Sequence, residues 1–226
     1  KIKEAASDYT RACELDRGLP RQRRQWMNAI LGLPGGRELI PSLTAEKPAC
    51  TKALIKHSIQ ERQTEAVIDI SRLSLQGKPG DARFLYWHAR SLYEVGRREE
   101  ASKVTAILLG LHPDSAEGFL LTGIMQRAQS NFEAMHLFNE SLNRAPNWEE
   151  PALLLAQTAI QERDEKIFLR AMHGLSQSLG NKGKTPQIFA LEAQFAYANE
   201  DFEDAARKFR RAGPWLYGYI KNTPRG

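Results

Sequence analysis

A short pattern that recurs about every 34 residues constrains this chain more than any other feature. In each copy, an alanine is followed four residues later by an apolar, aromatic or small residue. A small or apolar residue comes three residues after that. Copies start at Ala66, Ala101, Ala134 and Ala205, and a degenerate copy lies around Ala171. A fixed period of about 20–50 residues is typical of arrays in which similar supersecondary units stack on one another. We therefore expect repeated units rather than one irregular globule.

A second helical pattern precedes each copy. Residues 81–95 and 116–128 both place apolar side chains at spacings of three and four, which puts them on one stripe of a helix. Strand-like alternation is nearly absent from the sequence. Pro113, Pro146 and Pro186 fall at or after the ends of the copies, where proline stops a helix because it lacks an N–H donor. The predicted unit is thus helix, turn, helix and proline.

This unit resembles the tetratricopeptide repeat, whose pattern has small residues in the first helix, an aromatic residue after the turn and an alanine in the second helix. Residues 80–113 carry the family positions Leu85, His88, Ala89, Leu92, Gly96, Ala101, Thr105, Leu108 and Pro113. Two later stretches carry Phe119, Thr122, Gly123, Phe132, Ala134, Phe138, Leu142 and Pro146, then Phe189, Ala193, Phe202, Ala205, Phe209 and Ala212. The resemblance implies an all-α fold, a right-handed superhelical solenoid of antiparallel helix pairs.

The period also divides the chain. We expect repeats at residues 47–79, 80–113, 114–147 and 185–214, and a degenerate repeat at 148–184. Residues 1–16 resemble the second helix of a truncated upstream repeat, and 215–226 resemble a C-terminal cap or the start of a further helix. Residues 17–46 lose the period, so we expect an atypical helical linker or insertion with a break at 35–41. Because the chain starts at Lys1 rather than at a methionine, we expect a piece of a longer protein.

Composition and charge exclude several classes of protein. The sequence has 42% hydrophobic and 26% charged residues, which is ordinary for a folded chain and excludes a disordered one. No apolar run reaches about 18 residues, so we expect no membrane span, and the compartment stays open between cytoplasm and periplasm. The net charge of +5 permits an acidic partner. The densest basic run, Arg17 to Arg24, favours a solvated helix face over a nucleic-acid site, which would lose affinity steeply with salt.

No residues in the sequence form a recognisable catalytic or metal-binding pattern. Cys13 and Cys50 lie far apart without CxxC spacing, and the five histidines form no HExxH pair. His88 falls at a helix-packing position, where a hydrogen-bonded imidazole is its expected role. Residues 179–185 end like a phosphate-binding loop but carry Ser178 where that motif needs its first glycine. We therefore expect no enzyme, no cofactor and no metal.

The resemblance also implies where a partner would bind, on the first helix of each unit at its second, fifth, ninth and twelfth positions. Carried over to this sequence, the candidate partner-binding residues are Arg83, Tyr86, Arg90, Tyr93, Arg127, Gln157, Gln194 and Tyr197. Arginine and tyrosine in one stripe suit an extended or acidic segment, because arginine pairs with carboxylates through two parallel bonds and tyrosine adds apolar area. The alternative is that the tyrosines pack on a neighbouring repeat while the arginines are merely solvated.

These observations favour a non-catalytic scaffold that binds another protein or a peptide segment on its concave face. The alternative is that the chain is the scaffold or regulatory part of a larger enzyme, or of a bacterial exopolysaccharide synthesis or secretion machine. A catalytic domain or a membrane barrel in the full-length sequence would favour this alternative. Self-association through exposed repeat ends stays open as well.

Overall fold

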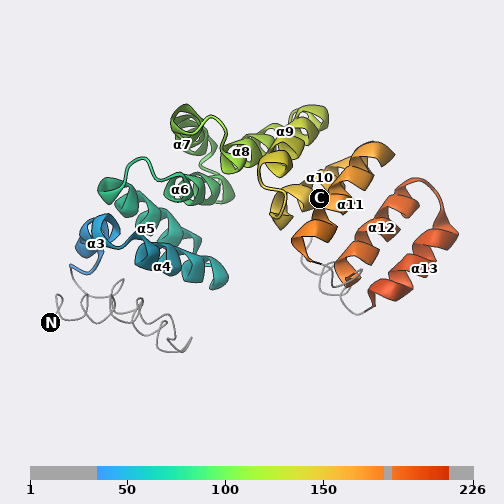
Figure 1. The fold of residues 1–226 in the computed structure, drawn as a ribbon, viewed down its shortest axis with the longest axis horizontal. Helices are drawn as coiled ribbons and strands as arrows, with labels where there is room; N and C mark the ends of the chain where they lie inside the picture. The colour runs from blue at the N-terminus through green and yellow to red at the C-terminus, as the bar shows by residue number, and fades with distance from the viewer. Residues whose placement is uncertain (1–34, 181–184, 214–226) are drawn as a thin grey trace. The chain divides into compact units, whose positions relative to one another are not determined.

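The computed structural model describes residues 35–180 and 185–213. Within these ranges the chain forms eleven α-helices and one short 3-10 helix, and no strand (Figure 1). The helices pack in consecutive pairs, which confirms the predicted all-α repeat fold. The chain divides after Pro113 into two compact units, which we describe separately. The predictions for residues 1–16, for 17–34 with its basic run, and for 215–226 lie outside the described residues.

The first unit contains a short helix followed by two helix pairs. The short elements are η1 (Arg37–Leu39) and α3 (Ile40–Glu46); the pairs are α4 (Pro48–Gln60) with α5 (Thr64–Gly77), and α6 (Ala82–Glu94) with α7 (Arg98–Leu111). Helix α5 also packs on α3 and on α6, so it joins these elements. A Cβ atom at Gly77 would lie 2.2 Å from the backbone oxygen of Pro41, and only glycine therefore fits where α5 approaches α3.

The break expected at residues 35–41 is wrong for most of its length. Residues 37–39 form η1, and α3 follows directly from Ile40. Pro41 lies in the first turn of α3, where proline is tolerated because the first N–H groups of a helix have no partner within it. Pro48 and Pro186 lie at the starts of α4 and α12 in the same way.

The second unit contains three helix pairs. They are α8 (Ala116–Gln126) with α9 (Asn131–Arg144), α10 (Glu149–Glu162) with α11 (Glu165–Ser178), and α12 (Pro186–Ala198) with α13 (Phe202–Ala212). Helix α10 packs on both α9 and α12, so neighbouring pairs touch. At the starts of five of these helices the N-cap side chain accepts a hydrogen bond from a backbone N–H in the first turn. These N-cap residues are Ser115, Ser130, Asp164, Thr185 and Asp201.

The tight turns within four of the pairs each contain a residue in the left-handed region. Gly96 has a φ of 83°, and glycine adopts this conformation without steric cost. Arg62, Arg163 and Glu200 occupy the other turns with φ values of 56°, 55° and 66°. A side chain in this region costs roughly 1 kcal/mol or more, so these turns store strain that the helix packing offsets.

The first helices share a small buried residue at their eighth position. It is Ala89 in α6, Gly123 in α8, Ala156 in α10 and Ala193 in α12, and each is buried. At Gly123 a Cβ atom would lie 2.6 Å from the Phe138 ring of α9, so the absence of a side chain lets the two helices approach. In α4 the equivalent residue is Ile55, which is also fully buried.

The second helices share a buried stripe, and one of its predicted starting alanines, Ala66, is off by one residue. Counted from the helix starts, the fourth residues are Val67, Ala101, Ala134, Phe168 and Ala205, all buried. Val67 therefore replaces Ala66, and in the degenerate copy around Ala171 the fourth position is Phe168, about one turn before the buried Ala171. Phe168 of α11 fits because its ring stacks on Phe195 of α12, with centroids 4.3 Å apart and planes 5° from parallel. A larger side chain at this position thus packs against the next pair.

Candidate functional site

The four candidate residues of the first unit lie on α6 and differ in exposure. Arg83 is exposed, Arg90 and Tyr93 are partly exposed, and Tyr86 is only 6% exposed. Tyr86 therefore presents little surface in this structure. Within the unit, the guanidinium of Arg83 lies 5.9 Å from the Trp87 ring, and Nε of Arg90 donates to Glu94 at 2.8 Å. The ring of Tyr93 lies 5.8 Å from the guanidinium of Arg98.

Basic side chains of the first unit thus already have intramolecular partners. Lys52 of α4 adds another example, since its Nζ lies 2.8 Å from a carboxylate oxygen of Asp81, the N-cap of α6. Burial raises the pKa of Asp81, but the hydrogen bonds from Lys52 and from the Phe84 and Arg83 amides outweigh it and lower the pKa below its ordinary value. A carboxylate-bearing partner would therefore compete with these internal contacts.

The four candidate residues of the second unit are contributed by α10, α12 and the end of α8. Arg127 caps the end of α8, and its Nη2 donates to Gln161 at 3.3 Å. Gln157 and Gln194 occupy the same ninth position of α10 and α12, two helices in contact, and both are partly exposed. Tyr197, one turn after Gln194, is 62% exposed. We call Gln157, Gln194 and Tyr197 the amide stripe.

One neighbour of the amide stripe is absent from the sequence-based site. The ring of Phe202, the first residue of α13, packs edge-on against Tyr197 with centroids 5.5 Å apart, and Phe202 is itself 59% exposed. The resemblance places an aromatic residue after the turn, but helical spacing does not relate residues on opposite sides of a turn. The two exposed rings extend the amide stripe with an apolar surface.

Polar contacts also join successive turns of the second unit. Asn131 donates to Glu162 at 2.7 Å, and Arg163 lies 3.7 Å from Glu200. Together with the bond from Arg127 to Gln161, these contacts connect α8 to α10, α9 to α10, and the α10–α11 turn to the α12–α13 turn. These contacts add polar links between neighbouring helix pairs.

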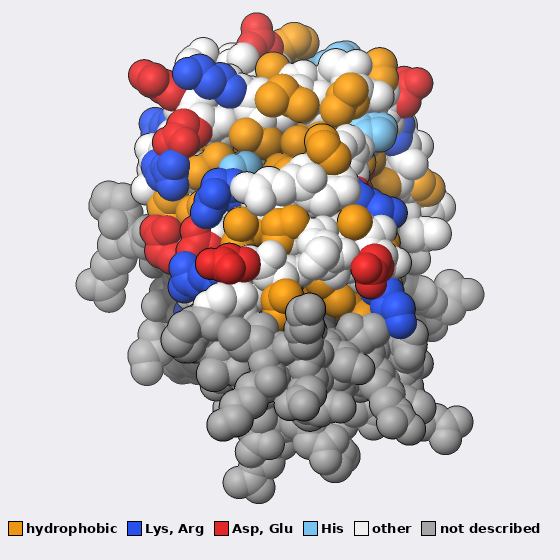
Figure 2. Space-filling view, turned by 90° about the vertical axis from the view of Figure 1, so that its left-hand side faces the viewer, with side chains coloured by type: hydrophobic (Ala, Val, Ile, Leu, Met, Phe, Trp, Pro, Cys, Tyr) orange, Lys and Arg blue, Asp and Glu red, His pale blue; other side chains and the backbone are white. Residues whose placement is uncertain are grey.

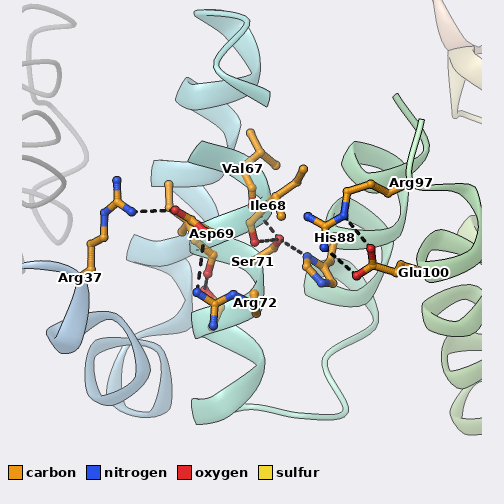
Figure 3. A network of polar contacts seen from close by, with 11 residues as sticks. Arg37, Val67, Ile68, Asp69, Ser71, Arg72, His88, Arg97 and Glu100 are labelled. Atoms are coloured by element: carbon orange, nitrogen blue, oxygen red, sulfur yellow. Dashed lines mark hydrogen bonds and ion pairs between the residues drawn. The ribbon is translucent and has the colours of Figure 1, made fainter. Parts of the chain in front are cut away.

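His88 has the structural role expected for it. Figure 3 shows its ring on α6 directed at Ser71 of α5, with Nδ1 3.0 Å from Oγ. The Ser71 hydroxyl donates to the Val67 backbone oxygen at 2.6 Å, so Nδ1 of His88 is the donor to Ser71. Arg97 and Glu100 pair with each other near the ring, and Arg37 pairs with Asp69 on the far side of α5 (Figure 3). His88 therefore joins two helix pairs.

The described residues include no group of three or more histidine, cysteine, aspartate or glutamate side chains able to hold a metal ion. On the face shown in Figure 2, lysine and arginine side chains are interspersed with aspartate and glutamate, and hydrophobic side chains lie between them. Thr185, at the end of the loop that resembles a phosphate site, caps α12 by accepting the Ile188 N–H at 3.4 Å. None of the helices in the described ranges is long and apolar enough to cross a membrane.

Comparison with protein-family models gives no match, and comparison with curated proteins also gives none. Solved structures do match. PilF from Pseudomonas aeruginosa is 22% identical, with 97% of this chain and 98% of that one covered and a TM-score of 0.62. MamA from Desulfovibrio magneticus is 13% identical, with 80% and 98% covered and a TM-score of 0.55. A thermophilic TPR protein from Thermus thermophilus is 18% identical, with 72% and 89% covered and a TM-score of 0.52.

These similarities agree with the packing described above. Helices pair consecutively, a small residue recurs at the eighth position of most first helices, and a buried stripe recurs on the second helices. The chain therefore has the tetratricopeptide-repeat fold.

Proposed function

We propose that this chain is a non-catalytic scaffold that binds an extended segment of another protein on the first helices of its second unit. The observation that carries the proposal is the equivalent position of Gln157 and Gln194 on the adjacent helices α10 and α12. A side-chain amide has both a donor and an acceptor, as a peptide group does. Two amides in register can therefore bind the backbone of an extended segment at two points.

The aromatic end of the amide stripe supplies apolar contact area. Tyr197 and Phe202 are both more than half exposed, although each ring packs on the other. Exposed aromatic side chains are frequent energetic centres of protein interfaces, because they bury a large area at little cost in side-chain entropy. We infer that an apolar side chain of the partner lies against these two rings.

The first unit offers a separate surface for acidic side chains, on α6. Arg83 and Arg90 lie on its surface, and arginine binds carboxylates through paired hydrogen bonds. Because Arg90 already pairs with Glu94, a partner carboxylate would replace that contact rather than add to it. The expected contribution of charge to affinity is therefore modest. A role as the scaffold part of a larger enzyme or of an exopolysaccharide secretion machine stays a separate prediction.

The test is a pull-down from lysate of the source organism with the parent chain and a variant carrying Gln157→Ala, Gln194→Ala and Tyr197→Ala. We expect the variant to retain less than about a tenth of the partner that the parent captures, which corresponds to a loss of about 1.4 kcal/mol or more. Circular dichroism verifies that the variant keeps its helices.

The matched control carries Leu169→Ala, Ser176→Ala and Gln177→Ala, three exposed positions on the second helix α11. It removes similar apolar and polar groups from a second helix of a pair instead of from the first helices. We expect the amount of captured partner to be unchanged. Equal capture by all three proteins, or loss in the control alone, contradicts the proposal.

A further inference from the structure

The charges of α13 are separated along its axis. Asp201 caps the helix by accepting the Asp204 N–H at 3.0 Å, and Glu203 and Asp204 lie in its first turn. Arg210 and Arg211 lie in its last turn. This order stabilises the helix, because acidic groups favour the positive N-terminus and basic groups the negative C-terminus.

Three arginines of α13 point away from the protein interior. Arg207, Arg210 and Arg211 are spaced by three and four residues and so share one face, which we call the arginine face. All three are exposed, and the Arg207 side chain is 68% exposed. The buried residues of the helix, Ala205 and Ala212, lie on the opposite side.

The arginine face carries more positive charge than its surroundings neutralise. Asp204 pairs with both Lys208 and Arg207, and these two cations lower its pKa below the ordinary value. Arg210 Nε donates to the Ala206 backbone oxygen at 3.3 Å, and the Arg211 guanidinium lies 4.2 Å from the Phe189 ring centroid. Among the described residues, neither Arg210 nor Arg211 pairs with a carboxylate.

Several arginines elsewhere in the chain pair with nearby acids, whereas Arg98 lies over the Tyr93 ring and Arg170 donates to Asn143. Arg97 pairs with Glu100, Arg144 with Glu140, and Arg163 with Glu200. At the end of α13, Arg210 and Arg211 are adjacent, and neither pairs with a carboxylate among the described residues. The Phe189 ring also holds Arg211 in place, so less side-chain freedom would be lost when a partner binds it.

We propose that the arginine face is a second interaction surface and that it binds an acidic polypeptide segment. Its three residues span about 6 Å along the helix, the rise of four residues. That length matches two carboxylates about one helical turn apart, and arginine can bind each of them through two hydrogen bonds. Duplex DNA and anionic membranes spread their negative charge over a far longer surface. Asp201 and Glu203 at the other end of α13 would repel such a surface.

The test uses the full chain and a fluorescein-labelled hexaglutamate peptide, with affinity measured by fluorescence anisotropy at low salt. The variant carries Arg207→Gln and Arg210→Gln and keeps Arg211, whose contact with Phe189 helps to pack α13. We expect its affinity for the peptide to fall at least about tenfold. The control carries Arg98→Gln and Arg170→Gln on α7 and α11, so it loses the same charge, and we expect its affinity to fall less than about threefold.

An equal loss of affinity in the variant and the control would show that only net charge matters and would overturn the proposal. No loss in the variant would overturn it as well. Arg210→Gln alone, which removes one contact to a helix carbonyl, tests the face if the double variant fails to fold. A 20-base-pair DNA duplex and phosphatidylserine vesicles are measured in parallel, and tighter binding to either overturns the choice of an acidic polypeptide. The test is independent of the proposed function, because none of its variants touches the amide stripe.

Discussion

At the scale of single residues, His88 makes the stability of the first unit depend on pH. Burial lowers the pKa of His88 most, the hydrogen bond to the Ile68 carbonyl opposes it, and the charges of Arg97 and Arg72 lower it again, against a smaller effect of Glu100. An unfolded histidine has a pKa of about 6.5, so below that pH the unfolded chain binds more protons than the folded one. We therefore expect stability to be complete above about pH 6.5 and to fall as the pH drops towards the lower folded pKa.

The measurement compares urea unfolding of the parent and of His88→Asn at about pH 7.5 and about pH 5.5. Asparagine keeps an N–H donor for Ser71 but does not titrate, and the other four histidines are common to both proteins. The parent should lose more stability on acidification than the variant does. Equal losses would contradict a neutral, buried role for His88.

Two buried serines should respond in opposite ways to replacement by alanine. The hydroxyl of Ser58 is buried and has no hydrogen-bond partner among the described residues, so Ser58→Ala should stabilise the chain by about 1 kcal/mol. The hydroxyl of Ser141 on α9 donates to the Ala116 backbone oxygen on α8 at 2.7 Å. Ser141→Ala should cost about 1 kcal/mol. Thermal unfolding of both variants tests the contrast, and a loss at Ser58 would show that its hydroxyl is satisfied.

At the scale of the helices, Gly123 controls how closely α8 and α9 approach. Its replacement by alanine would place a Cβ atom 2.6 Å from the Phe138 ring, and forcing the helices apart should cost about 1–3 kcal/mol. Gly110 on α7 is the matched control, because a Cβ atom there meets nothing within 4 Å. Gly110→Ala should stabilise by about 0.5–1 kcal/mol through the better helix propensity of alanine. Chemical denaturation distinguishes the two signs, and similar effects at both glycines would refute the close approach.

The helices also show how far the sequence predicts this fold. Period, prolines and small residues predict the helix pairs correctly, because the prolines stop helices locally and the small residues recur wherever two helices approach closely. The degenerate copy around Ala171 lies on α11, where Phe168 occupies the position that alanine holds in three other pairs and is accommodated by stacking on Phe195. Whether a larger residue can replace alanine here depends on packing against the next pair of helices, and residue spacing within one helix does not predict that.

The candidate site is predicted less well than the fold. The family resemblance places Gln157, Gln194 and Tyr197 on the surfaces of the first helices, and they are at least partly exposed there. The same resemblance gives Tyr86 the same role, although the folded chain buries it. The contact of Tyr197 with Phe202 crosses a turn, so it follows from the packing of α12 on α13 rather than from periodicity.

At the scale of the whole molecule, the division after Pro113 predicts that the second unit folds by itself. It has three helix pairs, and about three repeats are needed to bury a continuous core. A chain of residues 114–226 should therefore be helical and should unfold cooperatively on heating. Circular dichroism checks this expectation. A fragment with little helix, or one that melts gradually without a transition, would show that the core of the second unit depends on the first.

The central claim is that a partner binds on the first helices of the second unit. Hydrogen–deuterium exchange of the chain, alone and with the partner captured in the pull-down, tests it most directly, because it reports on each helix separately. We predict slower exchange on binding in α10 and α12, the helices that carry Gln157, Gln194 and Tyr197. Slower exchange in α9 and α11, with α10 and α12 unchanged, would contradict the claim.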